Sequence, residues 1–335
     1  MLFSPESKAL DIIPVGRIAV DFNPTDMNRP LSQSENFNKY LGGSPANIAV
    51  GMARLGRRVG FLARVSDDAL GTFVTDYFVR EGIDVSHVRR CVNGEKLGLT
   101  FTEILSPTQS SILMYREGAA DLSLSPEDVD EEYIASSRSL LISGTSLSAS
   151  PSREAALKAL ALAKKDGVTV IFDADYRPYT WKSPDEISVY TSLAAEKSDI
   201  VLGSREEFDL MERLLGLDGS DEASAAHWLS LSPRLIVIKH GKQGSDAWTA
   251  SEKWRVKPFP VAAMKGFGGG DGYASALLSS LMAGKSLPEA LERGSASAAM
   301  LVASHACSRD MPAEEALEQF IRGEKARYGE MVFPL

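Results

Sequence analysis

The sequence predicts an α/β fold, in which a doubly wound, mostly parallel sheet has helices on both faces and carries a small β-sheet lid. Three observations indicate this. Apolar strands alternate with amphipathic helices from about residue 139, two polar segments interrupt the pattern earlier, and three consecutive glycines open a helix near residue 268. A chain of 335 residues can bury a large core, so we expect a single domain over 1–335.

The first third of the chain predicts short strands and two helices. "LDIIPVGRIAVDF" (10–22) is typical of one or two strands, and "RVGFLARV" (58–65) of another. "SPANIAVGMARLG" (44–56) predicts a helix, because Ser44 suits an N-cap and a proline follows at the first helical position. A second helix is expected over 67–82.

Two polar, turn-rich segments, 23–41 and 97–116, do not fit a crossover helix. The second has the pattern of an antiparallel hairpin that turns around Ser106 and Pro107. Both segments are therefore expected to form the lid.

The later alternation is regular. Strands rich in β-branched residues that alternate with helices form βαβ units, which give a parallel sheet. The expected strands are 139–144, 168–175, 199–204 and 234–241, and the expected helices between them are 150–167, 183–197 and 205–216. Three more helices are expected at about 271–284, 286–306 and 312–326.

The composition narrows the class of partner. A net charge of −9 disfavours nucleic acid and anionic membranes, because both attract basic surfaces. Cys91 and Cys307 form no CxxC pair and the four histidines show no ligand spacing, so neither a disulfide framework nor a zinc site is expected. The chain has no signal-peptide pattern and no apolar run of ~18 residues, and we expect a cytoplasmic protein that binds small molecules.

The stretch "GFGGGDGYASALLSSLMAG" (266–284) is the main candidate for a catalytic segment. The amides of Gly268, Gly269 and Gly270 would face outward at a helix start, where the helix dipole favours anions. Asp271 falls in the first turn, where a carboxylate can take a proton from a phosphate acceptor. The alternative is a glycine-rich turn that Asp271 merely caps. A dinucleotide loop fits less well, because GxGxxG belongs to the first βα turn.

Two motifs, in this order, resemble the signatures of the ribokinase-like (PfkB) carbohydrate kinases. "YLGGSPANIAVG" resembles the family's GG-x-[GAP]-x-N pattern, and "FGGGDGYASA" resembles its G-A-G-D. The resemblance covers nearly the whole chain. It implies the ribokinase-like fold, ATP and Mg²⁺, and phosphoryl transfer to a sugar hydroxyl. Asp271 would be the base, and Gly268 to Gly270 would hold the moving phosphoryl group.

Further segments, among them "SILMYREGAADL", "DADYRPYTW" and "VIKHGKQGS", resemble a branch of the family that phosphorylates the 6-hydroxyl of a sugar acid. This resemblance implies a contact for the substrate carboxylate, and Tyr115, Arg116, Arg177 and Arg17 are the candidates, since a guanidinium can bind a carboxylate through two parallel hydrogen bonds. Arg177 could instead be a surface ion-pair partner, but ligands bind beyond the carboxyl ends of parallel strands.

The same resemblance assigns the remaining site residues. Asp21, Gly42, Gly43 and Asn47 would bind the sugar or shape its pocket; the alternatives are a turn aspartate for Asp21 and a buried amide for Asn47. The nucleotide side would comprise Lys239, Gly241, Gly244, Ser204, Glu207, Ala298 and Ser304, with Glu207 also acting indirectly on the metal. Alternatively, residues 239–244 form a hairpin turn without a ligand.

The chain departs from the family pattern at several positions. "KGF" (265–267) precedes the glycines where the family often has D-T-x, and Gly269 replaces an alanine. Glu207 is kept from the family's N-x-x-E, but Ser204 replaces the asparagine, which leaves metal positioning open. Asp175 likewise replaces the asparagine of D-x-N-x-R.

Several functions stay open from the sequence. A 2-keto-3-deoxygluconate kinase and a fructokinase are alternatives within the family, and a non-catalytic sensor of sugar acids or nucleotides is the alternative from another class. The intact Asp271 and glycine triplet argue against the sensor. An apolar lid edge would suit a homodimer formed through the lid.

Overall fold

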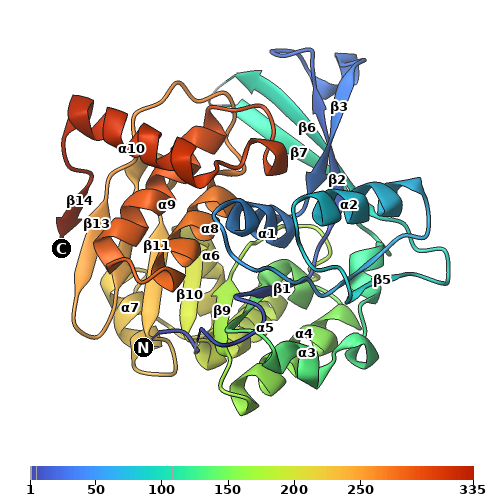
Figure 1. Cartoon of the computed structure of the whole chain (residues 1–335), viewed down its shortest axis with the longest axis horizontal. Coiled ribbons are helices and arrows are strands. Elements are labelled where there is room, and N and C mark those ends of the chain that lie inside the picture. The colour runs from blue at the N-terminus through green and yellow to red at the C-terminus, as the bar shows by residue number, and fades with distance from the viewer. Residues whose placement is uncertain (1, 5, 107–108) are drawn as a thin grey trace.

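The structure is a computed structural model that describes residues 2–4, 6–106 and 109–335. A central sheet lies between two layers of helices, and a second sheet projects from one side (Figure 1). In the described part of the chain, eight strands form the main sheet in the order β1-β8-β9-β10-β11-β12-β13-β14. The strands are β1 (Ile13–Val15), β8 (Ser139–Ser143), β9 (Thr169–Asp173), β10 (Ile200–Ser204), β11 (Leu235–Lys239), β12 (Ser245–Trp248), β13 (Lys253–Val256) and β14 (Val332–Pro334).

The first five strands in this order pair in parallel, and the last three pair antiparallel. The helices are α1 (Ser44–Arg54), α2 (Ala69–Arg80), α3 (Glu131–Ala135), α4 (Ser152–Lys165), α5 (Pro184–Lys197), α6 (Arg205–Glu212), α7 (Asp221–Leu229), α8 (Gly269–Met282), α9 (Leu287–Val302) and α10 (Glu314–Tyr328). The predicted doubly wound α/β fold is therefore confirmed, with an antiparallel extension at one edge of the sheet.

Each face of the main sheet has its own apolar core. One core joins the sheet to α1, α8 and α9, and the other joins it to α4, α5, α6 and α7. Neighbouring residues of a strand point to opposite faces, so Leu141 belongs to the first core and Leu140 to the second. Helix α8 is packed in the first of these cores, and this packing fixes the position of the glycine triplet at its start.

The second sheet has four strands in the order β3-β2-β6-β7 and is called the lid sheet below. Its strands are β2 (Ala19–Pro24), β3 (Phe37–Gly42), β6 (Gly98–Ser106) and β7 (Gln109–Tyr115). The segments expected to leave the α/β body thus supply most of this sheet. The hairpin of β6 and β7 is present, whereas Pro107 of its predicted turn lies outside the described residues. Strands β4 (Ala63–Val65) and β5 (Val88–Arg90) form a separate parallel pair.

Three details differ from the sequence prediction. Gly43, not Ser44, is the N-cap of α1, because Ser44 is already helical and its hydroxyl bonds elsewhere. Helix α7 and the antiparallel strands β12 to β14 were not predicted. Among the described residues, no helix combines the length and apolar character needed to span a bilayer.

Candidate active site

The first turns of α1 and α8 supply the centre of the site. Ser44 Oγ donates a hydrogen bond of 2.7 Å to Oδ1 of Asp271, and Asn47 Nδ2 donates one of 2.7 Å to Oδ2. Each carboxylate oxygen therefore has its own donor, and the two bonds fix the plane of the carboxylate. The two motifs that predicted the family meet at this point.

The glycine triplet forms the start of α8. Gly268 is the N-cap with φ +85°, a left-handed conformation that glycine adopts without strain. A Cβ at Gly268 would also lie 2.5 Å from Sγ of Cys307, so no larger residue fits. A Cβ at Gly270 would lie 3.7 Å from Nζ of Lys239, so a cation lies beside the helix N-terminus. The helix dipole, free amides and this cation favour an anion here.

Asp271 is buried among other charged groups. Burial raises the pKa of its carboxyl above the ordinary value, and the charge of Asp175 raises it further. The hydrogen bonds from Ser44 and Asn47 and the charge of Arg177 act in the opposite direction without cancelling the rise. A carboxylate with a raised pKa accepts a proton from a hydroxyl more readily.

The paired glycines before α1 leave space for neighbouring groups at one side of the site. A Cβ at Gly42 would lie 2.1 Å from Oδ1 of Asp21, which comes from the neighbouring strand β2. Gly43 has φ +99°, and a Cβ there would lie 2.4 Å from the backbone oxygen of Arg17. Their absent side chains thus allow Asp21 and the Arg17 backbone to pack against this segment. Burial raises the pKa of the Asp21 carboxyl.

A cleft between the lid sheet and the start of α8 brings these groups together. Its lining residues are Arg17, Asp21, Gly43, Ser44, Asn47, Thr100, Thr102, Ile112, Met114, Arg177, Phe267, Gly268, Asp271 and Cys307. The cavity volume is about 40 Å³, which holds a few waters at roughly 10–15 Å³ of accessible space each and is smaller than a six-carbon sugar acid. A larger hollow of about 410 Å³ beside α4 and α5 has a mostly apolar lining and none of the predicted site residues.

Arg17 is the cation of this cleft that lacks an acidic partner in the described structure. Its side chain is 4% exposed, Nη1 contacts Sδ of Met114 at 3.8 Å, and Nε has no hydrogen-bond partner among the described residues. Burial and the nearby charge of Arg116 lower the pKa of the Arg17 guanidinium, which Asp21 and Asp175 counteract. A buried guanidinium with a free donor is suited to an anionic ligand.

Arg177 lines the same cleft but is already paired. Its Nη2 lies 2.9 Å from Oδ1 of Asp175, and Nη1 donates to the backbone oxygen of Tyr176 at 2.7 Å. Asp175 has φ +32°, and aspartate and asparagine tolerate positive φ better than most other residues. It also accepts a 2.9 Å hydrogen bond from Ser143 Oγ. The pKa of Asp175 is lowered: burial alone would raise it, but Arg177 and Arg17 outweigh that effect.

Tyr115 and Arg116 do not line the cleft. Tyr115 is 59% exposed on the outer face of the lid sheet, because Met114, its neighbour in β7, is the residue that faces inward. Arg116 is buried in an ion pair with Asp121 at 2.5 Å and donates to the backbone oxygen of Thr145. The predicted substrate contacts of Tyr115 and Arg116 therefore stay predictions, and in this structure Arg116 anchors the start of the segment that follows β7.

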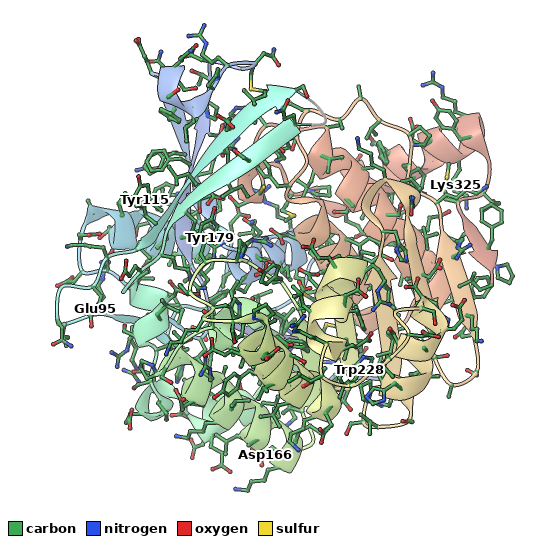
Figure 2. The ribbon with its side chains drawn as sticks, turned by 180° about the vertical axis from the view of Figure 1, so that it is seen from behind. Glu95, Tyr115, Asp166, Tyr179, Trp228 and Lys325 are labelled. Atoms are coloured by element: carbon green, nitrogen blue, oxygen red, sulfur yellow. The ribbon has the colours of Figure 1, made fainter. Side chains whose placement is uncertain are left out.

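Tyr179 connects the body to the lid sheet from the loop after β9. Its hydroxyl donates to the backbone oxygen of Ile112 in β7 at 2.7 Å (Figure 2). Ile112 itself lines the cleft. The loop that carries Asp175 and Arg177 is therefore attached to the lid strand opposite it.

Lys239 ends β11 on the other side of α8. Its Nζ lies 3.5 Å from Oδ1 of Asp173. Burial would lower the pKa of Lys239, but Asp173 and three further acids raise it. Residues 240–244 then form the hairpin connection to β12. Gly244 has φ +99°, and a Cβ there would lie 1.9 Å from the backbone oxygen of Val256, so both its conformation and its space require glycine. Gly241 has φ +54°, and a Cβ at this position would meet no atom within 4 Å.

Glu207 holds backbone groups. Its Oε2 accepts from the backbone N–H of Ser204 at 2.6 Å, which completes a capping box at the start of α6, and its Oε1 accepts from the N–H of Tyr176 at 2.8 Å. Glu207 therefore positions the loop that carries Asp175 and Arg177. Because both Glu207 oxygens accept hydrogen bonds from backbone N–H groups, Glu207 could act on a metal ion only indirectly. Burial raises the pKa of nearby Asp173 to about 7, although Lys239 lowers it.

The last two predicted residues follow α8 in sequence. Ala298 packs against Gly269, and Ser304 Oγ donates to backbone oxygens at the end of α9. The sequence prediction missed the Asp271 donor Ser44, because its place in the motif also suits a helix cap. It also assigned no role to Cys307 and Lys265, which have no motif of their own.

The fold and this site define a class of protein. The family model for "pfkB family carbohydrate kinase" matches residues 9–314. The chain belongs to this family of carbohydrate kinases. Among curated proteins, it is 62% identical over 98% of its length to the 5-dehydro-2-deoxygluconokinase of Clostridium perfringens, of which it covers 97%. It is 49% identical over 96% of its length to the enzyme of the same name from Geobacillus thermodenitrificans, of which it covers 96%.

Solved structures show the same fold. A PfkB protein from Polaromonas sp. JS666 is 30% identical with a TM-score of 0.79, over 90% of this chain and 99% of that one. An E. coli protein described as a ribokinase II, in complex with ATP and Mg²⁺, has a TM-score of 0.85 at 23% identity, over 94% of this chain and 99% of that one. The predicted ribokinase-like fold is thereby confirmed.

Proposed function

We propose that this kinase transfers the terminal phosphoryl group of ATP to the 6-hydroxyl of 5-dehydro-2-deoxy-D-gluconate, a step of myo-inositol catabolism. The name of the curated relatives supports the substrate, and the E. coli complex with ATP and Mg²⁺ supports the cosubstrate and the metal. The observation that carries the proposal is the buried Arg17, whose Nε has no partner among the described residues of the cleft.

Asp271 acts as the base in this proposal. Its carboxylate is held by Ser44 and Asn47 at the edge of the cleft and takes the proton of the 6-hydroxyl. The amides of the glycine triplet and the ammonium of Lys239 stabilise charge on the phosphoryl group as it moves. The chain thus contributes mainly position and electrostatics.

Magnesium would enter together with ATP. Within the described residues, the one group of three side chains spaced for a metal ion is Asp221, His240 and Asp246, and none of these lines the cleft. Glu207 is occupied by two backbone N–H groups. Asp173 accepts no hydrogen bond at Oδ1 from the described residues, although Lys239 Nζ lies 3.5 Å from this oxygen, so a water-mediated contact to the ion would run through Asp173. When bound, the ion neutralises charge on the ATP phosphates.

The substrate carboxylate would bind Arg17. A carboxylate that enters a closed site must exchange its hydration for charged donors. Arg177 is a less suitable donor because Asp175 already pairs with it. Asp21 and Thr100, which also line the cleft, would bind sugar hydroxyls.

The test compares substrates within one variant. Arg17→Met should lower kcat/KM for 5-dehydro-2-deoxygluconate by about 10- to 150-fold, the value of a hydrogen bond to a charged group, as measured by coupled ADP release. Turnover of fructose, which has no carboxylate, should change much less. Arg177→Met is the comparison variant, because it removes a guanidinium of the same cleft that Asp175 already pairs with. If the wild type prefers fructose or 2-keto-3-deoxygluconate, the proposed substrate is wrong.

The lid sheet would close over the sugar. The cavity of about 40 Å³ is smaller than a sugar acid, so we expect the strands that carry Thr100, Ile112 and Met114 to move when one binds. Closure excludes water, which would otherwise accept the phosphoryl group.

The outer face of the lid sheet would form a homodimer. Phe101 contacts Phe37 and Tyr115 edge-on there, and Leu113 and Tyr115 are 42% and 59% exposed. Apolar groups gathered on one exposed face are typical of an interface. Tyr115→Glu should convert a dimer to a monomer in sedimentation velocity; an unchanged sedimentation coefficient would exclude this surface.

A further inference from the structure

Two lysines flank the glycine triplet, and only one of them has a role in the mechanism above. A Cβ at Gly270 would lie 3.7 Å from Nζ of Lys239, and a Cβ at Gly268 would lie 3.7 Å from Nζ of Lys265. Lys239 has an acidic partner in Asp173. Lys265 forms no ion pair with any carboxylate that the structure describes. An ammonium buried without a counter-ion is destabilising, so it calls for an explanation.

The contacts of Lys265 hold its charge without cancelling it. The side chain is 1% exposed, and its Nζ donates to the backbone oxygen of Ala306 at 2.6 Å. Nζ also contacts Sγ of Cys307 at 3.5 Å and lies 5.2 Å from the ring centre of Phe267. A carbonyl, a thiol and an aromatic face all attract a cation while carrying no net charge. Asp21 and Asp310 are affected by this charge without forming an ion pair with it, so the charge also acts at the start of α8.

The same contacts join the glycine turn to the lid sheet. Ala306 and Cys307 belong to the turn after α9, and His305 of that turn accepts a 2.8 Å hydrogen bond from Asn23 Nδ2 at its backbone oxygen. The His305 ring is 3.1 Å from the hydroxyl of Tyr40. Asn23 lies in β2 and Tyr40 in β3, so one ammonium connects the phosphate side of the cleft with the segment that the lid sheet rests on.

We propose that Lys265 is a positioning residue for phosphoryl transfer: it fixes the Gly268 turn against residues 306–307 and places a positive charge beside the amides that receive the phosphoryl group. This inference rests on one part of the proposed function, namely that a phosphoryl group is transferred beside the glycine triplet. A full charge adds to the dipole of α8 in a region of low dielectric, where its effect is strong. Because Lys265 lies on the phosphate side, its charge acts on turnover more than on sugar binding.

Two variants test the proposal. Lys265→Met keeps the apolar stem and removes the charge, and kcat should fall by about 10- to 100-fold, less than the 10²–10³ that follows loss of a direct oxyanion donor, while KM for the sugar changes less than threefold. Lys265→Ala leaves space for a small cation, so propylammonium or butylammonium should restore part of kcat, with tetramethylammonium chloride holding the ionic strength. Lys257→Met is the matched control, because its ammonium also lies over an aromatic ring, that of Phe333.

The outcomes separate a charge effect from a structural one. A kcat within twofold of the wild type in folded Lys265→Met overturns the proposal. So does a loss in Lys265→Ala that alkylammonium does not relieve, or a failure of both variants to fold in its presence. All variants are compared on the sugar that the wild type uses fastest. An error in the proposed sugar acid would therefore appear in the wild-type data and leave the Lys265 comparison intact.

Discussion

Nδ2 of Asn47 lies 2.7 Å from Oδ2 of Asp271, although 224 residues separate the two in the chain. Asn47 is in the first turn of α1 and Asp271 is in the first turn of α8, and these helices pack against each other beneath the cleft. The orientation of the Asp271 carboxylate is therefore set by helix packing, and a substitution in either motif should alter the geometry of the other.

Replacement of Asp271 by asparagine should abolish most turnover. The amide keeps the shape and can still bond to Ser44, but it accepts no proton, so kcat should fall by ~10²–10⁴. ATP binding, measured by calorimetry, and the melting temperature should stay near the wild-type values. Retention of more than about a tenth of kcat would exclude Asp271 as the base.

Asn47→Ala should move the acid limb of the pH profile to higher pH. The amide bond stabilises the ionised form of Asp271, whose pKa burial already raises, so loss of the bond raises that pKa further. Turnover requires the ionised form and is lost as the pH falls through this pKa. Ser44→Ala should also move the acid limb of the kcat profile to higher pH, because the Ser44 hydrogen bond likewise lowers the pKa of Asp271. A uniform drop at every pH, with the limb unmoved, would contradict the assignment.

Gly42→Ala should impair sugar binding through Asp21. The new methyl group would lie 2.1 Å from the Asp21 carboxylate, which must turn away from the cleft. We expect KM for the sugar to rise about tenfold or more, because hydrogen bonds to a charged group are lost. Gly323→Ala in α10 is the control, since a Cβ there meets no atom nearby. Equal kinetics for the two variants would show that Asp21 does not bind the sugar.

The lid sheet should gain protection when the sugar binds. Hydrogen exchange of β3, β6 and β7 should slow in the presence of sugar acid, whereas α7, away from the cleft, should be unaffected. Tyr179→Phe removes the hydroxyl that donates to Ile112, so β7 should exchange faster in the free enzyme. Identical exchange with and without saturating sugar would rule out closure.

Asp173 should make stability depend on pH. Burial raises the pKa of its carboxyl to about 7 from an ordinary 3.8. Such a group stabilises the fold fully below pH 3.8 and loses that contribution as the pH rises through about 7, by up to ~4 kcal/mol. The free energy of unfolding of the wild type should therefore fall relative to Asp173→Asn across this interval. Urea titrations at several pH values measure the difference, and a constant difference would contradict the prediction.

The sequence predicted what local patterns determine. The alternation of strands and helices, the start of α8 and the position of Asp271 in its first turn all follow from periodicity and capping within one segment. The sequence also placed Arg177 beyond the end of β9. The sequence could not show that Asp175 forms an ion pair with this arginine. The pair depends on the backbone conformation of Asp175, φ +32°, which no sequence pattern predicts.

Contacts between distant segments could not be predicted from the sequence. The face of the lid sheet that Tyr115 occupies depends on strand register, and a shift of one residue exchanges it with Met114. Arg116 found a partner in Asp121, and Ser44 donates to Asp271 across the fold. Lys265 lies in the segment where the family often has D-T-x, but only the fold shows that its ammonium lies beside Gly268.

In the proposed homodimer, the aromatic outer face of the lid sheet would be a moving surface that two protomers share. In a pair joined through Phe101, Leu113 and Tyr115, the lid of one copy is a wall for the other. Sugar bound in one cleft then orders a surface that both copies use, and the second molecule binds a protein already partly rigid. Saturation curves should be sigmoidal for the dimer, and the Hill coefficient should fall toward one as the enzyme is diluted below its dimer Kd.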